Sequence, residues 1–265
     1  MASTVLSISS QVAYGNVGNS VAVPAMQARG HEVLAVPTVI LSNHPGHGKP
    51  VSLRMPAPEL AAILGALDGL GALSSCAAVM TGYFAANDQI YGVARIIQRM
   101  KQQNPQLFVL VDPIIGDGDA LYVPLPVAEA IRDTLLPLAT CITPNRFELG
   151  WLAGRGVTNV EEALAAARSL GIGEVLATSI PAGADRIATL AITGSDCFEC
   201  MTPLKPSMPH GTGDFLAGLY LAERLEHGPE EALRRSMAIL ERAIERSKES
   251  SILEIAAALQ RDREQ

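Results

Sequence analysis

Basic residues are scarce in this 265-residue chain, which has 20 lysines and arginines against 27 aspartates and glutamates. The formal net charge of −7 leaves no basic stripe to displace counterions from nucleic acid, so such a partner is not expected. No apolar run approaches the roughly 20 residues that span a bilayer, and the first residues lack the charged start of a secretory signal. We therefore expect a cytoplasmic protein that has no membrane partner.

Cysteine is also rare, with four residues at positions 76, 141, 197 and 200. This number is too small for a disulfide framework. Cys197 and Cys200 have the spacing of a zinc-binding pair, but a structural zinc site needs four ligands and the sequence has no second pair. We interpret them as part of a late strand or turn. A Gly-x-Gly-x-x-Gly fingerprint for dinucleotides is missing as well.

What the sequence does contain is the pattern of an α/β protein. Hydrophobic residues make up 48% of the chain and charged residues 18%, which favours one packed domain over residues 1–265 and argues against disorder. Short apolar runs predict strands at residues 4–8, 32–37, 76–83, 107–113, 140–144, 174–179, 186–193 and 196–201. Amphipathic or capped segments predict helices at residues 19–29, 58–71, 87–101, 128–138, 160–170, 215–225, 230–246 and 252–261, with another beginning at Asn145.

The most informative stretch is Gly211-Thr212-Gly213-Asp214, directly before an apolar helix-forming run. Its glycines allow a tight turn, and the unpaired N–H groups at the helix start make an anion site suited to phosphate. A carboxylate beside a phosphate makes chemical sense if it takes a proton from an attacking hydroxyl. A helix entry with a favourable acidic residue explains the same residues, and the motif alone leaves both interpretations open.

Other polar residues follow predicted strands, at the edge of a parallel sheet where α/β enzymes bind ligands. Ser10 lies in a small polar stretch after the first strand, and Asp112 ends an apolar run. Residues 114–124 have the glycine- and aspartate-rich composition of a mobile lid. Glu148 is spaced from Asn145 as in a capping box, so a capping role and a role toward magnesium both stay open.

His44 and His47 stand three residues apart in a glycine-rich stretch that has no acidic or cysteine partner nearby. This setting favours a polar loop, or a contact to a small ring-shaped substrate, over a metal site.

Taken in order, these motifs resemble the ribokinase superfamily and, within it, the pyridoxal (vitamin B6) kinases. The resemblance runs from about Val5 to the helix after Asp214. It rests on residues 7–19, 38–44, 81–83, 112–117, 122–124, 143–148 and 211–214. It implies a ribokinase-like three-layer sandwich with a central, mostly parallel sheet flanked by helices. It also implies a homodimer that uses ATP, Mg²⁺ and a monovalent cation, K⁺ or Na⁺, to phosphorylate the 5′-hydroxymethyl group of pyridoxal, pyridoxine or pyridoxamine.

The resemblance further implies a role for individual residues. Asp214 would be the catalytic base, with Gly211, Thr212 and Gly213 around the transferring phosphoryl group. The cation ligands would be Asp112, Thr143 and Glu148. ATP contacts would come from Asp112, Asp117, Tyr122, Asn145, Glu148, Thr178, Ser179, Gly211 and Thr212, and contacts to the vitamer from Ser10, His44, His47, Tyr83 and Asp214.

One position departs from the family pattern. Pro45 stands where many relatives have a threonine that reaches the ring, and proline has no donor to offer. His44 and His47 are candidates to replace that contact, and the preferred vitamer stays open. Two other functions also stay open: a hydroxymethylpyrimidine or other small-alcohol kinase of the same superfamily, and a non-catalytic B6-binding protein.

Overall fold

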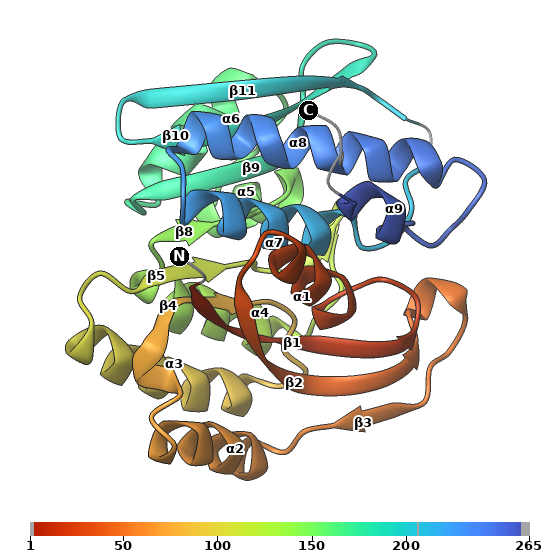
Figure 1. Cartoon of the computed structure of the whole chain (residues 1–265). Helices are drawn as coiled ribbons and strands as arrows, with labels where there is room; N and C mark the ends of the chain where they lie inside the picture. Colours follow the sequence, from red (N-terminus) through yellow and green to blue (C-terminus); the bar gives the residue numbers. More distant parts are fainter. Residues whose placement is uncertain (1–2, 206, 261–265) are drawn as a thin grey trace.

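The computed structural model describes residues 3–205 and 207–260 (Figure 1). In this part of the chain nine strands form one sheet, in the spatial order β11-β10-β9-β8-β5-β4-β1-β2-β3. Their bounds are β1 (Thr4–Tyr14), β2 (Glu32–Asn43), β3 (Ser52–Arg54), β4 (Cys76–Thr81), β5 (Phe108–Val111), β8 (Cys141–Ile142), β9 (Glu174–Pro181), β10 (Arg186–Thr193) and β11 (Asp196–Pro203). The six strands from β9 to β2 run parallel, whereas β3, β10 and β11 pair antiparallel at the two edges.

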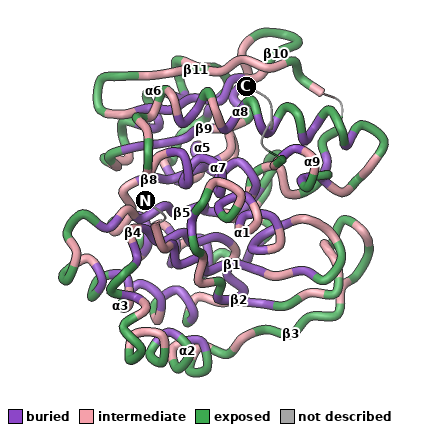
Figure 2. Tube along the Cα trace, in the orientation of Figure 1, coloured by how far each residue is buried: buried purple, intermediate pink, exposed green. Residues whose placement is uncertain are grey.

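Helices cover both faces of this sheet. Successive side chains of each strand point to opposite faces, so a separate hydrophobic core forms between the sheet and the helices on each side. Val5 and Leu110 face one core, whereas Leu6 and Val109 face the other. The first core is covered by α1 (Asn19–Ala28), α7 (Thr212–Arg224), α8 (Pro229–Arg246) and α9 (Ala256–Leu259), and the second by α2 (Ala57–Gly69), α3 (Asn87–Gln103), α4 (Leu125–Ala130), α5 (Arg146–Ala153) and α6 (Val160–Ser169). Figure 2 shows buried residues along the central strands and the sheet-facing sides of the helices. The predicted three-layer α/β architecture is confirmed.

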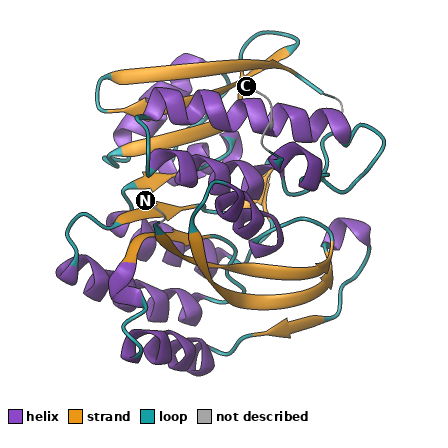
Figure 3. Cartoon of the chain, viewed as in Figure 1, coloured by secondary structure: helices purple, strands orange, loops and turns teal. Residues whose placement is uncertain are grey.

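The first two strands are longer than predicted (Figure 3). Residues 9–14, predicted as a polar stretch that follows the first strand, belong to β1, and residues 38–43 belong to β2. The two strands stay paired as far as Tyr14 and Asn43, with a bulge between Ser9 and Gln11. The parallel ladder satisfies the backbone there whatever the polarity of the side chains. Only residues 15–18 remain as the loop between β1 and α1.

Two predicted helices are also different. The helix predicted at 128–138 begins earlier, as α4, and continues as a π-turn at Ile131–Leu135 and a 3₁₀ turn at Leu136–Leu138. Proline at the start favours the earlier beginning, since its missing N–H is unpaired there in any case. The helix predicted at 252–261 shrinks to α9, because Ile252 forms a parallel β-bridge with His210. Residue 261 lies outside the described residues.

The strands predicted at 186–193 and 196–201 are confirmed as β10 and β11, which form a hairpin paired from Arg186 with Pro203 to Thr193 with Asp196. Cys197 packs on one core and Cys200 on the other, because an odd spacing on a strand places side chains on opposite faces. The two thiols therefore do not converge. Among the described residues, no helix is both long and apolar enough to cross a membrane.

Candidate active site

Two parallel helices, α1 and α7, begin side by side at the carboxyl edge of the sheet. Gly18 is the residue before α1, and Gly211 is the residue before α7. Further along the two helices, Gly218 of α7 packs closely on Ala22 of α1. A Cβ at Gly218 would lie 2.9 Å from the Cα of Ala22. The unpaired N–H groups of both helices therefore point toward one region and give it a positive potential.

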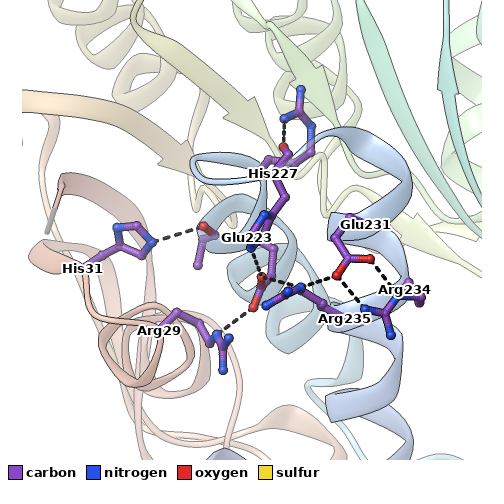
Figure 4. Close-up of polar contacts among 9 residues, drawn as sticks. Arg29, His31, Glu223, His227, Glu231, Arg234 and Arg235 are labelled. Atoms are coloured by element: carbon purple, nitrogen blue, oxygen red, sulfur yellow. Dashed lines mark hydrogen bonds and ion pairs between the residues drawn. The ribbon is translucent and has the colours of Figure 1, made fainter. Parts of the chain in front are cut away.

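The opposite ends of α1 and α7 are tied together by a buried carboxylate (Figure 4). Glu223 has a side-chain exposure of 2% and lies 2.7 Å from Nε of Arg29, which directly follows α1. His227 and Arg235 approach its other oxygen at 3.5 and 3.9 Å. This network keeps the two helices aligned, and hence keeps their first turns together at the far end.

Glycine is required at the start of both helices. Gly211 has a φ of 92°, and a Cβ there would lie 1.7 Å from the carbonyl oxygen of Asn16. Gly18 has a φ of 56°, and a Cβ there would lie 2.3 Å from Oγ of Ser10. Both backbones are in the left-handed region, which side chains disfavour. The predicted tight turn at Gly211 is thus present, and the backbone there packs closely on the β1–α1 loop.

Asp214 lies on the first turn of α7 and is partly buried. Burial raises the pKa of its carboxyl group to about 6, against the opposing effect of the nearby backbone N–H groups of Gly18 and of Asp214 itself. Asp112 is buried at the end of β5, where burial, followed by the carboxylates of Asp214 and Glu148, raises its pKa well above the usual value. The structure therefore brings these three acids into one cluster.

Glu148 uses both carboxylate oxygens. Its Oε2 accepts the N–H of Asn145 at 3.0 Å, while its Oε1 accepts the N–H of Ile115 at 2.8 Å. The capping box predicted for α5 is confirmed, and the same carboxylate also holds the loop that follows β5. Burial raises the pKa of Glu148 to about 7, although these hydrogen bonds oppose the rise.

The residues expected near ATP surround this acidic cluster. Thr143 lies beside Asp112, and its Oγ1 is buried without a partner in hydrogen-bond geometry. The short ribbon of β6 (Gly116–Asp117) and β7 (Ala120–Leu121) carries Asp117 and leads to Tyr122. Tyr122 is 56% exposed as a whole, yet burial of its hydroxyl raises its pKa, as do the carboxylates of Glu148 and Asp112.

Backbone strain marks the same edge of the sheet. Among the described residues, Ile114 and Ser179 are the non-glycine residues with positive φ, at 46° and 57°. Ile114 follows β5 by three residues, and Ser179 lies in β9 next to Thr178, which bridges to Asn145. Such conformations cost of order 1–3 kcal/mol each and cluster where ligands bind. Nothing in the residue types at these positions signals the strain.

The residues expected near the vitamer lie on the β1 side of the acids. Ser10 is buried on β1 against Gly18. Tyr83 is held through its backbone, since its N–H donates to Oγ of Ser9 at 3.2 Å and its carbonyl accepts from Oγ1 of Thr38 at 2.6 Å. These bonds fix the segment that follows β4 against β1 and β2.

His44 precedes the 3₁₀ turn Pro45–His47, and His47 is its last residue, beyond the end of β2. The ring of His210 stacks on that of His44, with 4.1 Å between centroids. His210 was missed by the sequence analysis, although its position directly before Gly211 was an available signal. The structure therefore joins the histidine-bearing turn to the start of α7.

Comparisons with known proteins agree with this geometry. Residues 55–255 match the family model described as phosphomethylpyrimidine kinase. A pyridoxine/pyridoxal/pyridoxamine kinase of Bordetella avium is 39% identical over 252 residues, which cover 92% of this chain and 81% of that protein. The structure of pyridoxal kinase from Entamoeba histolytica superposes with a TM-score of 0.91 at 27% identity, covering 98% of this chain and 95% of that one.

A third similar protein is the pyridoxal kinase of Leishmania donovani, whose structure was solved in complex with ADP and pyridoxine. It superposes with a TM-score of 0.88 at 29% identity, covering 97% of this chain and 92% of that one. The nine-stranded sheet, the two glycine-started helices and the acidic cluster are thus set in a fold that these kinases share. From the extent and identity of these matches, the chain belongs to the pyridoxal kinase family of the ribokinase superfamily.

Proposed function

We propose that this protein transfers the γ-phosphoryl group of ATP to the 5′-hydroxymethyl group of pyridoxal, pyridoxine or pyridoxamine. The observation that carries the proposal is the position of Asp214, on the first turn of α7 and near the backbone N–H of Gly18 that precedes α1. A carboxylate there lies between the vitamer-side residues on β1 and the acids beside β5. The names of the similar kinases support the same substrates.

In this proposal Asp214 accepts the proton of the attacking hydroxyl. Its pKa of about 6 leaves it mostly ionised at pH 7.5, and still basic enough to take a proton as the oxygen attacks phosphorus. Gly211, Thr212 and Gly213 offer backbone N–H groups to the oxygens of the phosphoryl group, on which charge accumulates. Ser10, His44, His47 and Tyr83 hold the vitamer so that its hydroxyl is in line with the phosphorus.

The donor set fits a divalent cation bound largely through water and phosphate. Within the described residues no group of three His, Cys, Asp or Glu side chains could hold a metal by itself. Magnesium commonly takes one or two carboxylates and completes its shell with water and nucleotide oxygens, which suits Asp112 and Glu148. Oγ1 of Thr143, buried beside Asp112, would be a further ligand for a cation, Mg²⁺ or a monovalent K⁺ or Na⁺. When bound, the metal would neutralise phosphate charge.

The nucleotide would lie on the β9 side of the acids. ADP in the related Leishmania structure supports a nucleotide site in this fold. Asn145, Thr178 and Ser179 would contact it from the sheet edge, and Asp117 and Tyr122 from the ribbon above. We infer that residues 116–123 act as a flap over the phosphates, because Glu148 and Asn145 both hold the ribbon by hydrogen bonds at its base.

The larger organisation is also proposed. One continuous sheet supports a single domain over residues 1–265. Val51 and Leu53, near or in the edge strand β3, are exposed by 77% and 66%, which supports burial of that edge in a homodimer. Free thiols at all four cysteines support a cytoplasmic location.

A second candidate is a kinase for hydroxymethylpyrimidine or another small alcohol. The matching family model is described as phosphomethylpyrimidine kinase, and this description supports a pyrimidine substrate as the second candidate. A vitamer-binding protein that has lost transfer is a further alternative, which the complete set of acids and glycines argues against.

A substrate panel tests the proposal. Phosphate transfer from ATP with Mg²⁺ is measured for pyridoxal, pyridoxine, pyridoxamine and hydroxymethylpyrimidine under equal conditions. We expect the highest kcat/KM with one of the three vitamers. A higher value with hydroxymethylpyrimidine would support the second candidate, and vitamer binding without transfer would support the non-catalytic one.

A further inference from the structure

Four aromatic rings from three separate segments gather beside the start of α7. His210 directly precedes Gly211, His44 and His47 belong to the turn after β2, and Tyr14 ends β1. The His210 ring lies 4.1 Å from that of His44, at an angle of 35°, and 5.6 Å from that of His47, edge to face. Tyr14 packs edge to face on His47 at 5.6 Å.

The seat of the His210 ring is shaped by Gly46. A Cβ at Gly46 would lie 2.3 Å from Nε2 of His210 and 2.9 Å from its Cε1, so only glycine leaves room for the ring in this place. The N–H of Gly46 donates to Nδ1 of His44 at 3.1 Å, which fixes the orientation of the ring that His210 stacks on. The turn and the His210 ring are therefore fitted to each other.

The backbone of His210 is anchored on the other side. Its N–H lies 3.3 Å from the carbonyl oxygen of Ser251, within a parallel bridge to Ile252. In the same segment the carbonyl of Leu253 accepts a hydrogen bond of 2.6 Å from the side chain of Asn16. Residues 251–253 thus hold both the β1–α1 loop, through Asn16, and His210, the residue before Gly211. From this anchored backbone, the ring of His210 extends to the turn at residues 43–48.

The rings form a packed contact and not a metal site. No group of three His, Cys, Asp or Glu side chains in the described ranges 3–205 and 207–260 could hold a metal. Partial burial, with the neighbouring histidines after it, lowers the pKa of His44 to about 4 and also lowers the pKa of His210. Both rings are therefore neutral near pH 7 and stack without repulsion.

We infer that His210 is a positioning residue: its ring, seated against Gly46 and stacked on His44, fixes the vitamer-side turn relative to the first turn of α7. It thereby sets where the substrate hydroxyl lies with respect to Asp214. The inference rests on the proposed function, because the distance that it controls is the one between a bound vitamer and the base.

A double-mutant cycle of His210→Ala and Gly46→Ala tests this inference. His210→Ala removes the ring, and Gly46→Ala displaces it by occupying its seat. Each is expected to lower kcat/KM for pyridoxal by about tenfold, the upper value of an aromatic pair, through KM for pyridoxal and with KM for ATP unchanged. Once the ring is gone, the Gly46→Ala methyl has space, so the double variant is expected to be no worse than either single variant.

Controls separate this effect from others. Gly65→Ala, in α2 with nothing within 4 Å of the added Cβ, should leave all constants unchanged. Thermal unfolding midpoints of all variants identify any loss of folding, which is not expected for His210→Ala because His210 is exposed. Losses that multiply in the double variant, or an equal rise in KM for ATP, would overturn the inference while the wild type still turns over vitamers. A wild type that phosphorylates no vitamer would overturn the proposed function and the inference with it.

Discussion

The carboxylate of Asp214, on the first turn of α7, lies near the backbone N–H of Gly18, which precedes α1 and opposes the rise of its pKa. This acid therefore faces the start of a second helix, which follows β1 after the loop at residues 15–18. The same helix is tied to α7 at its other end through Arg29 and Glu223. One pair of parallel helices therefore supplies both the carboxylate and the N–H groups suited to phosphate.

The pH dependence of the reaction should follow the acidic cluster. The pKa values of Asp214 and Glu148 are raised to about 6 and about 7, so both carboxyl groups take up protons as the pH falls through this range. A protonated Asp214 cannot act as a base, and a protonated Glu148 has lost charge that a cation needs. We expect kcat/KM for the vitamer to fall on the acid side of pH 7. A profile that stays flat down to pH 5 would contradict these roles.

Asp214 should also lower the stability of the folded protein at neutral pH. Its folded pKa of about 6 is above its ordinary value of 3.8, so between these values the folded state binds more protons than the unfolded one. Stability is therefore lost as pH rises through this window, and the cost is complete above pH 6. Asp214→Asn should raise the free energy of unfolding at pH 7.5 by about 1–3 kcal/mol, a gain that shrinks toward pH 4. Urea unfolding at both pH values measures it, and a variant less stable than the wild type at pH 7.5 would refute it.

Gly211 and Gly213, the two glycines at the start of α7, should respond differently to substitution by alanine. At Gly211 the added Cβ would lie 1.7 Å from a backbone oxygen, whereas at Gly213 it meets nothing within 4 Å. Gly211→Ala should lower both the unfolding midpoint and turnover. Gly213→Ala should fold normally and lose turnover alone, because its methyl group occupies only the space proposed for phosphate. Full activity of Gly213→Ala, measured beside its thermal midpoint, would exclude Gly213 from the phosphate site.

The Glu223 network predicts an effect on stability. Removing a buried, paired carboxylate leaves Arg29 uncompensated, so Glu223→Ala should lower the free energy of unfolding by about 3 kcal/mol. By contrast, Glu245 near the end of α8 pairs with Lys248, both largely exposed, and Glu245→Ala should leave the free energy of unfolding nearly unchanged. Urea unfolding of the two variants compares them directly. Equal losses would show that the buried pair contributes no more than a surface one.

The fold and the main motif were predictable because their signals are local. Apolar runs located the central strands, and the string from Gly211 to Asp214 carried its own chemistry in adjacent residues. The capping box at Asn145 and Glu148 was likewise visible in the spacing. The roles of residues 211–214 toward phosphate and of Glu148 toward a cation stay predictions.

What the sequence did not reveal depends on contacts between distant residues. The stacking of His210 on His44 exists only because the C-terminal segment and the β2 turn meet in space. The extra length of β1 and β2 comes from pairing with each other, which overrides the polarity of residues 9–14. The positive φ angles of Ile114 and Ser179 have no counterpart in their residue types.

The most direct test of the central claim compares the wild type with Asp214→Asn in single-turnover phosphoryl transfer from ATP to pyridoxal, with the binding of both ligands measured separately. Asparagine keeps the shape of the side chain and removes the base. We predict that binding is retained while the rate of transfer falls by about a hundred- to ten-thousand-fold. A transfer rate within about twofold of the wild type, well below what a general base supplies, would contradict the assignment of Asp214 as the base.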